Sequence, residues 1–315
     1  MSTVLQPRGM PSEAGRPEVF RDALLREGVL LEGGTEGLYL RSAAFESVAR
    51  GVEALMRNQM TGDGAEEMHP PPGMTTRALG RSGYMRSFPQ LAGTVGCFCG
   101  DDAAHRRLVA KLDGEEDWTD QQATSEVSLI PAACYPTYAI IAARGPLPPE
   151  GHRVAIAAWC FRHEPSPDPC RMQMFRQCES VFYGSADGAR AHRDLWLGRA
   201  QEMARMLDLP HAVEPANDPF FGRAGKLMAR SQRELELKME LLIPVSDETR
   251  PTACASVNMH LDGMGQKWGI VASDGTVAHT ACVGYGIERL SLALFRHHGA
   301  EPRDWPAAVR TALWS

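Results

Sequence analysis

The spacing of apolar residues predicts helices in the first part of the chain. Apolar side chains recur there at helical intervals, at Ala44, Val48, Val52, Leu55 and Met56. This spacing predicts a helix over residues 43–56, and a shorter amphipathic helix is predicted over 17–28. The stretch 61–73 contains three consecutive prolines at 70–72, so it must leave the helix and run extended.

Beyond about residue 88 the pattern becomes that of strands. Strands are predicted over 127–130, 153–161, 173–183, 235–245, 252–260 and 268–272. The clearest is the fourth, in which leucine or methionine alternates with glutamate or lysine, the period of a half-buried strand. Helices are predicted over 191–209 and 285–298. Runs of strands with few intervening helices favour an α+β fold, in which a mostly antiparallel sheet is packed by helices.

Composition narrows the class of protein. With 315 residues, of which 43% are hydrophobic and 23% charged, the chain is long enough for a large folded domain. We assign that domain to residues 17–315 and interpret residues 1–16, which hold two prolines and two glycines, as a disordered lead-in. The apolar runs are too short to cross a bilayer and the N-terminus does not resemble a secretory signal, so we expect a cytoplasmic protein. A net charge of −6 disfavours a large RNA partner.

The ends of two predicted strands carry residues suited to a nucleotide. Arg162 ends one strand and Arg171 precedes the next, so both guanidinium groups can face one concave surface and form paired bonds with phosphate. Glu164 is placed to accept a hydrogen bond from an exocyclic amine, and Phe175 offers a ring face to a purine. On these residues alone, the alternative is a surface hairpin whose charges are solvated.

A glycine-rich segment opens the last predicted helix. Its sequence is Gly284-Tyr285-Gly286-Ile287-Glu288-Arg289. Glycines before a helix allow a ligand to approach the backbone closely, and Arg289 would lie one turn into the helix. Taken alone, a packing role for these glycines is the simpler interpretation.

Taken together, the two segments resemble motifs 2 and 3 of the class II aminoacyl-tRNA synthetases. In that family motif 2 has an arginine and a glutamate at a strand end, then a loop and an aromatic residue on the returning strand. Motif 3 is a glycine-x-glycine-x-x-arginine sequence that opens a helix. Over about residues 40–300 the chain is similar to the amino acid:[carrier protein] ligases and to the catalytic core of the atypical, zinc-dependent seryl-tRNA synthetases. Under about 50 residues precede that core, so we expect no long helical arm for tRNA.

The resemblance implies a homodimer and a zinc site. Residues 84–91 are similar to the segment after motif 1, which carries the dimer interface in that family. Cys134, Glu179 and Cys282 would be the zinc ligands, and two thiolates with one carboxylate leave a fourth position for the α-amino group of the substrate. Without the resemblance, each of these cysteines is best interpreted as a buried core thiol, since the sequence has no C-x-x-C pair.

The resemblance also implies the residues of the nucleotide site. Arg162 and Arg289 would be catalytic, with Arg162 on the α-phosphate and Arg289 on the outer phosphates and the adenine. Glu179 and Arg162 would contact the substrate amino acid. The other predicted ATP and magnesium contacts are Glu164, Arg171, Met172, Phe175, Lys238, Glu240, Ala253, Cys254, Ala255 and Ser256. The alternative for Lys238 and Glu240 is an exposed strand face.

A basic surface is predicted without the resemblance. Its residues lie three or four positions apart and therefore share one face of a helix, at Arg223, Lys226, Arg230 and Arg233. Such a face would attract an acidic protein such as a carrier protein. The alternative is a solvated surface.

These predictions combine into a two-step ligase. A small amino acid, with glycine favoured and alanine as the second choice, would be activated by ATP as an aminoacyl adenylate. The phosphopantetheine thiol of a carrier protein would then accept the aminoacyl group. The expected cofactors are Zn²⁺ and Mg²⁺ with ATP, and no tRNA or membrane partner is expected. Two alternatives remain: a tRNA-charging enzyme of the seryl type, and an inactive synthetase paralogue with a regulatory role.

Overall fold

The computed structural model describes residues 9–219 and 236–314, and a seven-stranded sheet forms its centre. The strand order is β3-β7-β8-β12-β11-β10-β9. Every neighbouring pair is antiparallel except β3 and β7, which are parallel. The strands are β3 (Glu66–Met68), β7 (His152–Phe161), β8 (Met174–Gly184), β9 (Ala212–Pro215), β10 (Lys238–Ile243), β11 (Thr252–Leu261) and β12 (His279–Gly286). The predicted α+β fold with a mostly antiparallel sheet is therefore confirmed.

Three long helices cover one face of this sheet. They are α2 (Ala43–Gly62), α7 (Ala186–Met206) and α10 (Ile287–His298). The helix predicted at 43–56 is α2, and it continues one and a half turns further because its apolar stripe extends to Met60. Ser42 fixes its start by accepting a hydrogen bond from the Phe45 N–H.

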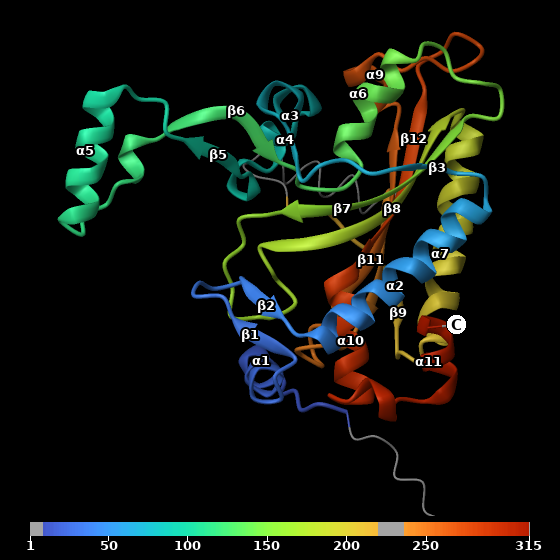
Figure 1. Ribbon diagram of the computed structural model, residues 1–315. Helices are drawn as coiled ribbons and strands as arrows, with labels where there is room; N and C mark the ends of the chain where they lie inside the picture. Colours follow the sequence, from blue (N-terminus) through green and yellow to red (C-terminus); the bar gives the residue numbers. More distant parts are fainter. Residues whose placement is uncertain (1–8, 220–235, 315) are drawn as a thin grey trace, which may run out of the picture.

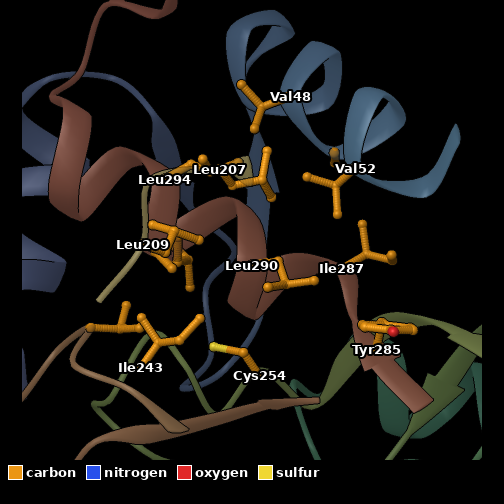
Figure 2. Packing of buried hydrophobic residues seen from close by; sticks show 14 of the residues in the cluster. Val48, Val52, Leu207, Leu209, Ile243, Cys254, Tyr285, Ile287, Leu290 and Leu294 are labelled. Atoms are coloured by element: carbon orange, nitrogen blue, oxygen red, sulfur yellow. The ribbon is translucent and has the colours of Figure 1, made fainter. Parts of the chain in front are cut away.

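The main hydrophobic core lies between these helices and the sheet. Figure 2 shows Val48 and Val52 of α2 pointing toward Ile287 and Leu290 of α10, above strands that contribute side chains such as Cys254. All five of these residues are at most 1% exposed. This face of the sheet therefore serves stability and leaves the opposite face for chemistry.

Within the described part of the chain, helices pack on only part of the opposite face. Helices α3 (Thr76–Ser82), α6 (Tyr135–Ala143) and α9 (Gly263–Trp268) pack there around Tyr138 and Ile156. Toward the connection between β7 and β8, the same face carries polar side chains. The candidate active site lies on that part of the sheet.

A small three-stranded sheet carries an arm that projects from the body (Figure 1). It consists of β4 (Gly73–Thr75), β6 (Ala123–Leu129) and β5 (Thr94–Cys97), in that order, with helix α5 (Asp102–Asp113) between β5 and β6. No residue of α5 is buried. Of this arm, only the end of β6 is predicted from the sequence.

The remaining elements lie at the periphery. They are α1 (Pro17–Arg26), β1 (Leu30–Glu32), β2 (Tyr39–Arg41), α4 (Tyr84–Ser87) and α11 (Ala307–Trp314), with short 3-10 turns at Pro89–Leu91, Thr119–Gln121 and Pro302–Asp304. The helix predicted at 17–28 is confirmed as α1. Among the described residues, no helix has both the length and the apolar character needed to cross a membrane.

One sequence-based assignment of secondary structure is wrong. Residues 268–272 do not form a strand, since Trp268 ends helix α9 and Gly269 adopts the left-handed conformation, with φ of +73°. Only the isolated bridge between Val271 and Val277 has strand character there. The helix predicted over 285–298 is α10, which begins at Ile287 because Tyr285 belongs to β12.

The lead-in predicted over residues 1–16 also needs correction. Met10 is 4% exposed, and its N–H donates to the Arg296 carbonyl oxygen at 2.9 Å. Residues 9–16 are therefore attached to the domain, because this segment contributes an apolar side chain to the core. Residues 1–8 lie outside the described part of the chain.

Candidate active site

Strand β8 presents alternate residues to the two faces of the sheet. Phe175, Gln177 and Glu179 point to the partly covered face, whereas Arg176 and Cys178 point to the core. Directly opposed residues of neighbouring strands share a face. Glu179 therefore shares its face with its register partner on β12, Gly284.

The register extends this face across two more strands. Asn258 of β11 lies opposite Cys282 of β12 and also opposite Lys238 of β10. Ser256 is likewise opposite both Gly284 and Glu240. The face shared with Glu179 therefore includes Lys238, Glu240, Ser256, Asn258 and Cys282. Strand pairing is what brings together residues that are far apart in the sequence.

The three predicted metal ligands are in contact. Cys134 lies at the N-terminal cap of α6, and its thiol forms hydrogen bonds with Cys282 and Glu179. The Ala133 N–H donates to Glu179 Oε1 at 2.9 Å. All three ligand side chains are buried, being 5% exposed or less. The structure thus brings together a helix start and two strands at one point.

The pKa values of the three side chains in this cluster are shifted from their ordinary values. The hydrogen bond to Cys282 and burial raise the pKa of Cys134 well above the ordinary value of a thiol. The hydrogen bond from Cys134, together with the charge of His260, lowers the pKa of Cys282 well below that value. Burial and the neighbouring Cys282 raise the pKa of Glu179 to about 7. Of the two thiols, Cys282 therefore loses its proton before Cys134.

The cluster holds side chains of the kinds that bind zinc, but here these side chains bond to one another. Within residues 9–219 and 236–314, no three His, Cys, Asp or Glu side chains are arranged so as to hold a metal ion. Two sulfur donors and one carboxylate in a buried cluster nevertheless match the chemistry that zinc prefers. Asn258 Nδ2 and His260 Nε2 each lie 3.7 Å from Cys282 Sγ, so polar groups surround that sulfur.

Arg162 stands beside this cluster at the end of β7. Its Nε donates to the Pro131 carbonyl oxygen at 3.0 Å, and its guanidinium carbon lies 5.4 Å from the centroid of the Phe175 ring. Glu164 and Arg171 form an ion pair of 3.0 Å. The predicted residues of the hairpin therefore lie together, and Arg162 connects their end of the site to the thiol cluster.

Arg289 contacts the same hairpin from helix α10. Its Nε donates to the Cys170 carbonyl oxygen and its Nη1 to the Ala253 carbonyl oxygen, each at 2.9 Å. The Arg162 N–H donates to the Gln173 carbonyl oxygen at 3.0 Å. Both predicted catalytic arginines are thus held against the segment that joins β7 to β8.

Lys238 is buried, which excludes the exposed strand face as its environment. It is 9% exposed, and its Nζ lies 2.6 Å from Asp218 Oδ1 and 2.9 Å from Glu240 Oε1. Asp218 was not among the predicted site residues. A lysine between two carboxylates on this face forms a compact charged group close to the predicted nucleotide contacts.

Some predicted ATP contacts point away from this face. The side chains of Met172, Cys254 and Ala255 belong to the hydrophobic core on the opposite face, so only their backbone atoms are available to a ligand. Ala253 uses its carbonyl oxygen to hold Arg289. The predicted basic docking face lies outside the described residues, since Arg223, Lys226, Arg230 and Arg233 all fall within 220–235.

Sequence reasoning missed Gln177. Its Oε1 lies 3.3 Å from the Ala133 N–H nitrogen and 3.4 Å from Cys160 Sγ, between the two ends of the site. The period of two along β8 was the signal that identifies it, because Gln177 lies midway between Phe175 and Glu179.

Comparison with known proteins identifies close relatives. No protein-family model matches the chain. The amino acid--[acyl-carrier-protein] ligase 2 of Bradyrhizobium diazoefficiens is 44% identical over 292 residues, covering 92% of this chain and 86% of that protein. The amino acid--[acyl-carrier-protein] ligase 1 of the same organism is 44% identical over 283 residues. The type-2 serine--tRNA ligase of Methanococcus aeolicus is 26% identical over 166 residues, which is 31% of its length.

Solved structures establish the fold. The M. kandleri seryl-tRNA synthetase, crystallised with A. aeolicus tRNASec, aligns with 97% of this chain at a TM-score of 0.79 and 18% identity. The Pyrococcus horikoshii seryl-tRNA synthetase complexed with ATP aligns at a TM-score of 0.67. The chain spans 60% and 59% of these two synthetase chains, so the likeness concerns their cores. With a class II synthetase core of the seryl type and relatives at 44% identity over most of its length, the chain belongs to the amino acid--[acyl-carrier-protein] ligases.

Proposed function

We propose that the protein activates a small amino acid with ATP and transfers it to the phosphopantetheine thiol of an acyl carrier protein. The names of the relatives from Bradyrhizobium diazoefficiens support the reaction class. The observation that carries the proposal is the position of Arg162. Its guanidinium group lies over the Phe175 ring. It is also near enough to Glu179 for its charge to counteract the rise that burial causes in the pKa of that carboxyl. One guanidinium group can therefore serve a nucleotide and an amino acid together.

In the first step, a carboxylate oxygen of the amino acid attacks the α-phosphorus of ATP, and the bond to pyrophosphate breaks. Arg162 holds the carboxylate and the α-phosphate in line, and its charge stabilises the negative charge that gathers on the phosphorus oxygens. Arg289 holds the outer phosphates, which Mg²⁺ bound with ATP would also neutralise. Catalysis is thus positioning and charge neutralisation, without a protein nucleophile.

Nucleotide binding requires one rearrangement. Phe175 stacks under the adenine, and Glu164 accepts a hydrogen bond from the adenine amine. Glu164 is paired with Arg171, whose side chain is 51% exposed. Separating an exposed pair of this kind costs about 1 kcal/mol or less. Arg171 therefore moves from Glu164 to the outer phosphates at little energetic cost when ATP binds.

Cys134, Glu179 and Cys282 would hold a zinc ion at the amino-acid end of the site. A bound zinc would supply an acceptor for the α-amino group and so select against acids that lack an amine. The chain's own residues prepare this site: the Ala133 N–H orients the Glu179 carboxylate, and Asn258 lies against the sulfur of Cys282.

Glycine is the favoured amino acid, with alanine second. A pocket that excludes one methyl group gains only about 1–3 kcal/mol of discrimination, or roughly 10- to 200-fold. We therefore expect measurable activation of alanine by an enzyme whose preferred substrate is glycine.

In the second step, the phosphopantetheine sulfur attacks the carbonyl carbon of the adenylate. The bond between that carbon and the phosphate oxygen breaks, AMP leaves, and the thiol proton passes to solvent. The product is an aminoacyl thioester on the carrier protein. Arg223, Lys226, Arg230 and Arg233 remain the proposed dock for an acidic carrier protein, and a homodimer remains a prediction that light scattering would test.

Two assays test the proposed function. ATP–pyrophosphate exchange over the standard amino acids should proceed with glycine and more weakly with alanine. Carrier protein bearing phosphopantetheine should then become aminoacylated, whereas carrier protein without the arm and bulk tRNA should not. Charging of tRNA would support the seryl-type alternative, and absence of any exchange would support an inactive paralogue.

A further inference from the structure

Four charged side chains form a network on the core side of the sheet, behind the candidate site. The Arg176 guanidinium binds the Glu46 carboxylate through two parallel hydrogen bonds of 2.9 and 3.0 Å. Its third nitrogen, Nε, donates to Glu288 Oε1 at 2.8 Å. Arg41 lies 3.5 Å from the same Glu288 oxygen. One arginine of β8 is thus bound to carboxylates of both α2 and α10.

Glu288 is the most buried member of this network. It is 2% exposed, and its second oxygen accepts a hydrogen bond of 2.6 Å from the backbone N–H of Arg176. Trp159 of β7, the register partner of Arg176, lies close to both arginines. The guanidinium carbons of Arg41 and Arg176 are 4.7 and 4.9 Å from the Trp159 ring centroid. Glu288 therefore holds Arg176 by its side chain and its backbone at once.

A buried ionic network of this kind is poorly explained by stability alone. Removing charges from water costs about as much as their pairing returns, so apolar side chains of similar volume would stabilise the fold equally well. Burial lowers the pKa of Arg176, and only the charges and hydrogen bonds of Glu288 and Glu46 reverse that effect. What the network does provide is fixed geometry, because the planar guanidinium fork admits few orientations.

The positions of the two partners in the sequence connect this geometry to the site. Arg176 lies between Phe175 and Gln177 on β8, and Glu288 directly precedes Arg289 at the start of α10. Phe175 is the proposed adenine platform, and Arg289 is the proposed phosphate contact. The Arg176–Glu288 pair therefore connects the backbone next to Phe175 to the backbone next to Arg289. In the proposed function these two residues hold the nucleotide from opposite sides.

We propose that Arg176 and Glu288 are positioning residues that fix Phe175 and Arg289 relative to each other and so set the affinity for ATP. Neither residue touches the nucleotide. Glu46 extends the same network to helix α2, so the positions of β8, α10 and α2 are fixed relative to one another. The inference rests on the proposed function only in requiring that the protein binds ATP.

The test is a measurement of ATP binding by isothermal titration calorimetry, which does not depend on the identity of the amino acid. Glu288→Gln keeps the shape of the side chain but leaves two buried guanidinium groups without their shared charge. We expect ATP to bind about 10- to 100-fold more weakly to this variant, the loss that a small misplacement of binding groups produces. Exchange assays should show the change in the KM for ATP, with the KM for the amino acid little altered.

Asp63→Asn is the matched control. It breaks the ion pair between Asp63 and Arg199, which joins the end of α2 to α7 and contacts none of the site residues. This variant should lose thermal stability and keep the wild-type affinity for ATP. Arg176→Lys keeps the positive charge but loses the fork, so its affinity should fall less than that of Glu288→Gln.

The outcomes separate the two proposals. Unchanged ATP affinity in Glu288→Gln, with a lowered melting temperature, would overturn the positioning role and leave a structural one. If Glu288→Gln does not fold, Arg176→Lys decides the question, and wild-type affinity in that variant overturns the inference. If the wild-type protein itself binds no ATP, the proposed function and this inference both fail. If the wild-type protein binds ATP and the variants bind it equally well, only this inference fails.

Discussion

Glu179 and Gly284 face each other across β8 and β12, and the absence of a side chain at Gly284 leaves the space that the Glu179 carboxylate occupies. A Cβ atom built at position 284 would lie 3.4 Å from Cγ and 3.6 Å from Cδ of Glu179. These are ordinary contact distances, so a single methyl group just fits. Anything larger has to displace the carboxylate.

This relationship predicts a size limit at position 284. Gly284→Ala should retain pyrophosphate exchange within about threefold, since its methyl group only touches Glu179. Gly284→Val adds branched carbons that overlap the carboxylate, and it should lose about 100-fold or more through misplacement of a substrate-binding group. Exchange kinetics at saturating ATP would measure both. A fully active valine variant would contradict the placement of Glu179 in the site.

Cys134 is predicted to be required for metal binding and for activity. Cys134→Ala should contain no stoichiometric zinc by elemental analysis and should show no exchange, because two ligands hold zinc far more weakly than three. The matched control is Cys178→Ala, which removes a buried thiol from the core face of the same sheet. The control should lose only about 1–2 kcal/mol of unfolding free energy and keep its metal and its activity. Retained activity in Cys134→Ala would remove the metal role.

Lys238 is predicted to combine a structural and a functional role. Lys238→Met removes the cation that Asp218 and Glu240 share, and losing a hydrogen bond between charged groups costs about 1.5–3 kcal/mol. We expect a lower unfolding free energy in urea together with a raised KM for ATP.

Arg144→Met is the control for this variant. It breaks an exposed pair with Glu66, where a surface salt bridge is worth about 0–1 kcal/mol. Equal effects of the two variants on ATP binding would show that Lys238 has no role in the site.

His192 predicts a pH dependence of stability that is independent of any metal. Burial lowers the pKa of His192 to about 4, against 6.5 for the free side chain. The unfolded chain therefore takes up a proton first as the pH falls, so the contribution to stability is complete above 6.5 and is lost toward 4. The loss is about 3 kcal/mol.

Replacing this histidine tests the prediction. His192→Gln should flatten that part of the stability profile in urea unfolding measured between pH 7 and 4. His69→Gln, at a side chain that is 60% exposed, should not change the profile. A wild-type slope in His192→Gln would assign the pH dependence to other groups.

The sequence predicted the regular elements well where a face of an element or a run of its residues is apolar. Helix α2 and strands β7, β8, β10 and β11 lie close to the predicted segments. Apolar residues repeat on one face of α2, whereas β7 and β8 are buried on both faces and were predicted from their apolar runs. Strand β12 was missed because its end was assigned to the following helix. Trp268, Ile270 and Ala272 alternate in burial without forming a strand, which explains the one false strand.

The residues of the candidate site could also be predicted only in part from the sequence. The hairpin residues from Arg162 to Phe175 could be predicted because they are close in the sequence and of a suggestive chemistry. The approach of Cys134, Glu179 and Cys282 could not be derived from spacing, because strand register and the start of α6 decide it. Only the family resemblance suggested these three together. The Arg176–Glu288 pair escaped both routes, since its residues face the core.

The alternation along β8 has a consequence for how this protein tolerates changes in length. Deleting or inserting a single residue within the strand would exchange the two faces, placing Cys178 where Glu179 stands and burying a carboxylate in the core. The proline-rich connection at 164–169, whose ends are tied by Arg162 and Gln173, is free of that constraint. Natural or engineered indels should therefore accumulate in this connection and be absent from the strand that follows it.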